Sequence, residues 1–281
     1  MKFLVAIALC SLLYPLYVVH KQLSGHKERI EKDPSQWGAT FEDILYRAED
    51  GVVLRGWWVR GESDRAVLLL HGKGGSRNGY HCGIFDLGRW YWRRGYSVMM
   101  VDLRAHGESG GHYTTLGLKE HRELLAWLEK IDPDHRYRWC VHGFSMGAVT
   151  AMMMRQKAPT VVERVVADAP WIDFGYLAMR ELRKRAWLPP TFYSYVRWIA
   201  ETFFGQNFDV IDNRERVRSL CKEPVLYLFE GDDTLLGSYH ADLLHELCSE
   251  ARIERFDGLD HVEAFKERPQ AYTEILRSYG L

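Results

Sequence analysis

Apolar and polar residues follow two patterns along this chain, and each pattern predicts a type of regular structure. Residues 41–48 and 52–60 alternate on either side of Glu49-Asp50-Gly51. Because Asp-Gly is a preferred hairpin turn, this segment predicts two antiparallel strands. Short apolar or β-prone segments farther along predict strands buried within a parallel sheet. These segments cover residues 65–70, 97–101, 137–141, 161–167 and 224–229.

Helices are predicted between these strands. Strands that alternate with helices after an opening hairpin predict an α/β fold, in which helices cover both faces of a mostly parallel sheet. Residues 173–206 interrupt this alternation with an insert that is rich in aromatic side chains. The helical segments are expected at about 78–94, 116–131, 148–157, 238–249 and 262–279, with one more short strand at 252–256.

The N-terminus has a third pattern. Residues 3–19 form a nearly unbroken apolar run, which is close to the minimum length for a membrane span. This favours an uncleaved signal anchor over residues 1–22, a polar linker at 23–40 and one domain over 41–281. A cleaved signal peptide and a buried helix are the alternatives. The chain is therefore expected to be membrane-anchored, or else secreted or periplasmic, and positive charges on both flanks leave the side of the membrane open.

Composition narrows the possible functions only slightly. The chain has 281 residues and a formal net charge of −1, which gives no indication of nucleic-acid binding. Its five cysteines are scattered without a C-x-x-C pair, so neither a zinc site nor a disulfide framework is predicted. We expect no metal and no cofactor.

One short motif points to chemistry. Gly143-Phe144-Ser145-Met146-Gly147 lies between a predicted strand and a predicted helix. A serine between two glycines at such a turn matches the nucleophile elbow G-x-S-x-G. Side chains at 143 or 147 would collide with the neighbouring strand or helix. The following helix would point its N–H groups at an oxyanion formed beside Ser145, which is therefore the candidate nucleophile.

A serine nucleophile needs a base. His240 and His245 lie within a predicted amphipathic helix, where packing or surface exposure explains them. His261 instead follows a strand end and a loop, which places it on the same edge of the sheet as Ser145. His261 is therefore the candidate general base.

The base needs a carboxylate to orient it. Asp232 and Asp233 follow the predicted strand at 224–229. In open α/β sheets, ligands bind at the edge where the carboxyl ends of the parallel strands meet. Ser145, an aspartate at 232 or 233, and His261 are therefore expected to converge there.

Together these motifs resemble the α/β-hydrolase family of serine hydrolases, over about residues 41–280. The resemblance implies that the backbone N–H groups of Lys73 and Met146 form an oxyanion hole. It also implies that Asp233, rather than Asp232, orients His261. The matching segments are His71-Gly72-Lys73-Gly74-Gly75, Asp102-Leu103-Arg104-Ala105-His106-Gly107-Glu108-Ser109, the elbow, Asp233-Thr234-Leu235-Leu236 and Asp260-His261. Glu230 stands where the family often has a glycine.

The function implied by this resemblance is cleavage of carboxylic esters through an acyl-enzyme intermediate. The chain looks most like bacterial lysophospholipases and esterases with a short helical lid, so a small-molecule or lipid ester is the expected substrate. A serine peptidase or amidase of the same fold, and a non-catalytic membrane-tethered binding module, are the alternatives. The insert at 173–206 is interpreted either as core packing or as a lid that places Trp187 and Trp198 over an apolar pocket.

Overall fold

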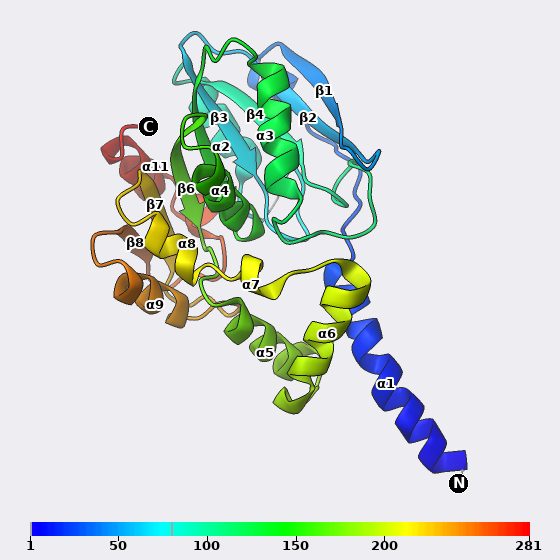
Figure 1. Cartoon of the computed structure of the whole chain (residues 1–281). Helices are drawn as coiled ribbons and strands as arrows, with labels where there is room; N and C mark the ends of the chain where they lie inside the picture. The colour runs from blue at the N-terminus through cyan, green and yellow to red at the C-terminus, as the bar shows by residue number, and fades with distance from the viewer. Residues whose placement is uncertain (1, 80) are drawn as a thin grey trace.

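One sheet runs through the molecule (Figure 1), and the computed structural model describes residues 2–79 and 81–281 of the chain. The strands are β1 (Phe41–Arg47), β2 (Val53–Val59), β3 (Arg65–Leu70), β4 (Ser97–Asp102), β5 (Arg138–Phe144), β6 (Val162–Asp168), β7 (Val225–Glu230) and β8 (Arg252–Phe256). Their order is β1-β2-β4-β3-β5-β6-β7-β8. β2 pairs antiparallel with β1 and with β4, and the other neighbours pair parallel. The predicted hairpin and the mostly parallel sheet are confirmed.

Alternate residues of the central strands face opposite layers. In β3, Leu68 and Leu70 join the apolar cluster on one face, and Val67 and Leu69 join the cluster on the other. All four side chains are fully buried. Burial on both faces explains why this strand reads as a continuous apolar run rather than as an alternating one.

Helices cover both faces of the sheet, as predicted. Apolar residues of α3 (Glu120–Ile131), α4 (Met146–Lys157), α8 (Arg214–Ser219) and α9 (Tyr239–Leu247) belong to the cluster on one face. Those of α2 (Ile84–Trp92), α10 (Ala264–Glu267) and α11 (Pro269–Ser278) belong to the cluster on the other. The α/β fold class is therefore confirmed.

Some helices begin later than their patterns predicted. The helix expected from residue 116 starts at Glu120, whose carboxylate accepts the N–H groups of Thr115 at 2.8 Å and Gly117 at 3.0 Å. These bonds hold the preceding residues in a turn. The last predicted helix is divided at Pro269, which opens α11 because proline fits the first helical position but not a helix interior.

The insert folds into helices at the carboxyl edge of the parallel strands. It contains α5 (Phe174–Arg185), the short η2 (Pro190–Phe192) and α6 (Tyr193–Phe204), and α7 (Phe208–Ile211) follows it. In Figure 1, α5 and α6 lie below the sheet, and α6 runs beside α1 (Lys2–Leu23).

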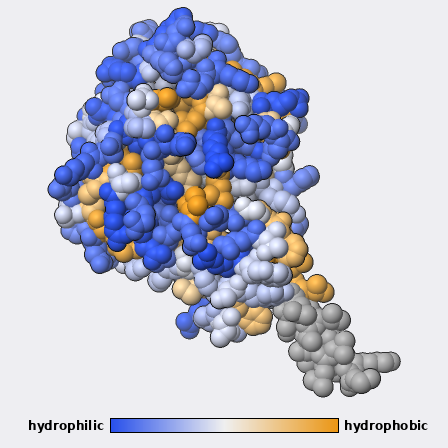
Figure 2. All heavy atoms as spheres, viewed as in Figure 1, coloured by the Kyte–Doolittle hydropathy of each residue, from blue (hydrophilic) through white to orange (hydrophobic). Residues whose placement is uncertain are grey.

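The first helix, α1, projects from the rest of the molecule in Figure 1, and Figure 2 shows apolar surface beside its junction with the body. The side chains of residues 1–12 lie outside the described part. Val18 and Val19, at the end of the apolar run, are buried against the domain and not free to contact lipid. Among the helices described, none is long and apolar enough to cross a membrane. The anchor predicted from residues 3–19 is therefore not supported.

A disulfide joins Cys221, before β7, to Cys248, after α9, with their Cα atoms 5.6 Å apart. Cys82 and Cys140 are buried free thiols. The sequence analysis did not predict this bond, since it found no sign of a disulfide framework. Their separation of 27 residues carries no pairing signal, and only the packing of α9 against the sheet brings them together.

Candidate active site

Ser145 lies in a strained turn between β5 and α4. Its backbone adopts φ 53° and ψ −111°, which few residues with a side chain adopt. A Cβ at Gly143 would stand 2.1 Å from the carbonyl oxygen of Gly147, and a Cβ at Gly147 would stand 2.4 Å from that of Leu70. Both glycines are therefore required by the close approach of β3, β5 and α4.

The three residues predicted to form a triad lie within hydrogen-bond distance of one another. His261 Nε2 is 2.9 Å from Ser145 Oγ, and His261 Nδ1 is 2.6 Å from Asp233 Oδ2. The other carboxylate oxygen of Asp233 accepts the N–H groups of Leu235 at 2.8 Å and Leu236 at 2.6 Å. These bonds fix the carboxylate, so it can hold the imidazole with Nδ1 protonated and Nε2 free to accept the serine proton.

Asp233 and its neighbour Asp232 differ in burial and in their contacts with His261. Asp233 is buried and contacts the imidazole, whereas Asp232 is exposed. Asp260 joins the two loops, because its carboxylate accepts the N–H groups of Thr234 at 2.7 Å and His261 at 2.8 Å. Burial alone would raise the pKa of Asp260, but these hydrogen bonds outweigh it and lower the pKa.

The two predicted oxyanion donors lie on either side of Ser145. The loop before Lys73 passes close to the nucleophile, since a Cβ at Gly72 would stand 3.2 Å from Ser145 Cβ. Met146 is the first residue of α4, so its N–H lies at the positive end of that helix. Within the part of the chain described, no hydrogen bond occupies either N–H group. Both remain available to a developing oxyanion.

A cavity of about 280 Å³ adjoins Ser145 and His261. Its wall is largely apolar, and the helices of the insert supply much of it. The lining side chains of the insert include Phe174, Leu177, Leu182, Val196 and Ala200, and Phe208 of α7 also lines the cavity.

The two tryptophans expected over the pocket do not line it. Trp187 is 87% exposed and Trp198 is 51% exposed. Trp198 stacks on Tyr195 on the outer side of α6, whereas Val196 and Ala200, one turn apart, face the cavity. The insert therefore roofs the cavity with side chains other than these two tryptophans, and the role expected for Trp187 and Trp198 is not supported.

Sequence analysis missed one wall of the cavity. Val18, Val19, Gln22 and Leu23, at the end of α1, line it together with Ser145. The same apolar run was interpreted as a membrane anchor, because hydropathy alone does not distinguish a lipid-facing helix from one that packs on a neighbouring domain.

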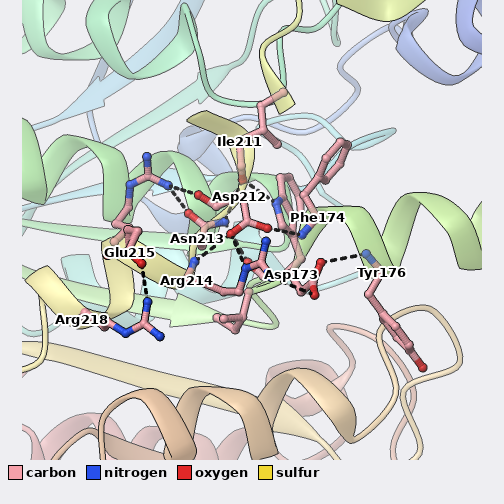
Figure 3. A network of polar contacts seen from close by, with 12 residues as sticks. Asp173, Phe174, Tyr176, Ile211, Asp212, Asn213, Arg214, Glu215 and Arg218 are labelled. Atoms are coloured by element: carbon pink, nitrogen blue, oxygen red, sulfur yellow. Dashed lines mark hydrogen bonds and ion pairs between the residues drawn. The ribbon is translucent and has the colours of Figure 1, made fainter. Parts of the chain in front are cut away.

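The start of the insert is bonded to the segment that follows the insert (Figure 3). Asp173 caps α5 by accepting the N–H of Tyr176 at 2.8 Å, and Asp212 accepts the N–H of Phe174 at 3.1 Å. The buried side-chain amide of Asn213 donates to the carbonyl oxygen of Trp171 at 2.8 Å, just before the insert. These bonds hold the insert at a fixed place over the cavity.

The insert also contacts the loop that carries Asp233. The guanidinium group of Arg180, on α5, donates to the carbonyl oxygens of Thr234 at 3.0 Å and Leu236 at 3.2 Å. Within the described residues, no group of three or more His, Cys, Asp or Glu side chains could hold a metal ion.

Several known proteins resemble this chain. The model of the alpha/beta hydrolase fold family matches residues 65–208. The structure of the esterase Pf2001 of Pyrococcus furiosus is similar, with a TM-score of 0.74 and 27% identity over 92% of this chain and 98% of that chain. The uncharacterized protein YfhR of Escherichia coli O157:H7 is 22% identical over 84% of this chain and 78% of YfhR. The pimeloyl-[acyl-carrier protein] methyl ester esterase of Salmonella heidelberg is 31% identical over 40% of each chain. The family match covers more than half of the sequence, and the chain therefore belongs to the alpha/beta hydrolase fold family.

Proposed function

We propose that this hydrolase is a serine esterase, with Ser145 as the nucleophile, His261 as the general base and Asp233 as the residue that orients the imidazole. The observation that carries the proposal is the unbroken series of hydrogen bonds from Ser145 through His261 to Asp233, beside an apolar cavity. A serine without a catalytic role would need neither partner.

The proposed reaction gives each of these groups a role. Ser145 Oγ attacks the ester carbonyl carbon while His261 Nε2 takes the hydroxyl proton. The N–H groups of Lys73 and Met146 stabilise the oxyanion. The bond to the alcohol oxygen then breaks, and His261 returns the proton to the leaving alkoxide. A water molecule, deprotonated by His261, hydrolyses the acyl-enzyme, which releases the carboxylic acid and restores the serine.

The cavity favours esters with an apolar acyl group. Burial of each methylene contributes about 0.8 kcal/mol, which is roughly a fourfold gain in binding per carbon until the cavity is full. The insert at 173–206 would act as the lid of this acyl site. The names of two relatives, an esterase and a methyl ester esterase, support ester cleavage as the reaction.

A fluorophosphonate probe tests the nucleophile. The wild-type protein should be labelled on Ser145, as located by mass spectrometry, and should hydrolyse short acyl esters. Ser145→Ala should lose the label and lower turnover by several orders of magnitude, because the triad acts as a unit. Unchanged ester hydrolysis in Ser145→Ala would show that another group is the nucleophile. A folded wild-type protein that neither labels nor hydrolyses esters would refute the proposal.

A further inference from the structure

Two buried carboxyl groups lie beneath the proposed triad. Asp168 is the last residue of β6 and Glu230 the last residue of β7, and they are 0% and 3% exposed. Leu228 pairs with Asp168 across these strands. Glu230 follows Leu228 by two positions, so both carboxyl groups project from the same face of the sheet. This is the face that α2 and α11 cover.

Most of the carboxyl oxygen atoms of Asp168 and Glu230 accept no hydrogen bond from an N–H or hydroxyl group of the described residues. Tyr272, on α11, donates to Asp168 Oδ2 at 2.6 Å. Asp168 Oδ1 and both carboxyl oxygens of Glu230 are buried, and no N–H or hydroxyl group of the described residues bonds to them. Leaving such oxygens unpaired is costly, and more so if both groups are charged. A carboxylic acid proton on Glu230, donated to Asp168, supplies the missing hydrogen bond.

The electrostatic surroundings agree with this placement of the proton. Burial raises the pKa of Glu230, and the neighbouring charge of Asp168 raises it further. Burial also raises the pKa of Asp168, while hydrogen bonds from Tyr272 and from Glu230 act in the opposite direction. Glu230 is therefore the member of the pair that keeps its proton.

The pair connects two strand ends that support residues of the triad. The carbonyl oxygen of Asp168 accepts the N–H of Ser145 at 2.7 Å, so the end of β6 holds the nucleophile. The loop that follows Glu230 carries Asp233, whose carboxylate reaches His261. A hydrogen bond from Glu230 to Asp168 thus links the end of β6, which holds Ser145, to the end of β7, which precedes Asp233.

We propose that Glu230 is a positioning residue that acts in its protonated form, and that loss of its proton in alkaline solution inactivates the enzyme. The inference rests on the proposed function, since it concerns the alignment of Ser145 and Asp233. Ionised Glu230 would place a second negative charge beside Asp168 and remove the hydrogen bond between them. The ends of β6 and β7 would then separate beneath the triad.

Neutral groups surround the pair on the side of α2 and α11. Burial raises the pKa of Tyr272 well above its ordinary value, and that of Cys82, before α2, to about 12. His142, on β5, lies 2.8 Å from the Tyr272 hydroxyl, and burial lowers its pKa to about 3. None of these three groups changes its charge in mildly alkaline solution.

Charged groups face Glu230 from the loops after β7 and β8. The negative charge of Asp233 opposes ionisation of Glu230, and a protonated His261 favours it. The negative charges of Asp168 and Asp233 therefore both help to hold the proton on Glu230.

The variant Glu230→Gln tests the proposal, because its amide can donate the same hydrogen bond but cannot ionise. Wild-type kcat should fall in alkaline solution by about tenfold for each pH unit above the pKa of Glu230. Glu230→Gln should stay within about threefold of wild type at pH 7 and lack this alkaline fall. Glu215→Gln, whose side chain is 86% exposed, serves as the control and should keep the wild-type profile. An unchanged alkaline fall in Glu230→Gln would overturn the proposal.

Two measurements on the wild-type protein do not require activity, and they separate this inference from the proposed function. The infrared carbonyl band of a protonated carboxyl group should be present at pH 7 and disappear in alkaline solution. The free energy of unfolding should also fall as pH rises from the ordinary carboxyl range to the raised pKa of Glu230, since the unfolded chain releases this proton first. A wild-type protein that lacks this infrared band at pH 7 and shows no such fall in the free energy of unfolding would overturn the inference. This result would hold even if Ser145 is labelled by the probe and Glu230→Gln fails to fold.

Discussion

At the scale of residues, two adjacent aspartates provide a matched pair for testing the triad. Asp233→Asn should lower kcat/KM by about 10³–10⁴-fold, because an amide at this position favours the wrong tautomer of His261. Asp232→Asn should change it by less than about twofold, since Asp232 is exposed and makes no contact with the imidazole. Steady-state hydrolysis of a short chromogenic ester measures both variants. An equal loss of kcat/KM in the two variants, or a larger loss in Asp232→Asn, would show that Asp233 is not the residue that orients His261.

Single residues could be predicted where chemistry follows from local sequence. The glycines beside Ser145 indicate a tight turn, and the loop positions of Asp233 and His261 follow from the strands that precede them. The pairing of Glu230 with Asp168 could not be predicted. It depends on β6 lying next to β7 in one particular register, and nothing near either residue in the sequence encodes that register.

At the scale of elements, the strands were predicted more closely than the roles of the helices. Strand periodicity reflects burial, so β1, β2 and β3 appear in the sequence almost as they are in the structure. A helix shows its apolar face in sequence but not the partner that covers that face. The end of α1 therefore resembled a membrane segment, although Val18 and Leu23 line the cavity beside Ser145.

The wall formed by α1 gives a prediction about acyl chain length. Val19→Phe should fill part of the cavity and lower kcat/KM for octanoyl esters by about tenfold, because overpacking typically costs about 1–3 kcal/mol. Acetyl esters, which need little of the cavity, should be hydrolysed within about twofold of the wild-type rate. Trp187→Ala is the control, because Trp187 is 87% exposed and should affect neither substrate. If Val19→Phe kept the wild-type ratio of octanoyl to acetyl ester hydrolysis, the acyl chain would not bind in the cavity beside Val19.

At the scale of the whole molecule, alternation of strands and helices was sufficient to predict the fold class, but not the spatial order of the strands. The chain places β4 between β2 and β3, and it continues outward from β3 through β5 to β8. This order brings the carboxyl ends of β5, β7 and β8 to one edge, and the loops after them carry Ser145, Asp233 and His261. Contacts between segments distant in sequence, including the disulfide, emerge only from that order.

The disulfide gives a prediction about the stability of the whole domain. It closes a loop between residues 27 positions apart, and such a link stabilises a folded chain by about 3–4 kcal/mol, mainly by restricting the unfolded state. For a domain of this size, Cys221→Ala should therefore lower Tm by roughly 6–16 °C. The measurement is thermal unfolding of wild type and variant, each with and without a thiol reductant. The reductant should lower the wild-type Tm to nearly that of the variant and leave the variant unchanged. A wild-type Tm that equals the variant's without reductant would show that Cys221 and Cys248 are not bonded in the folded protein.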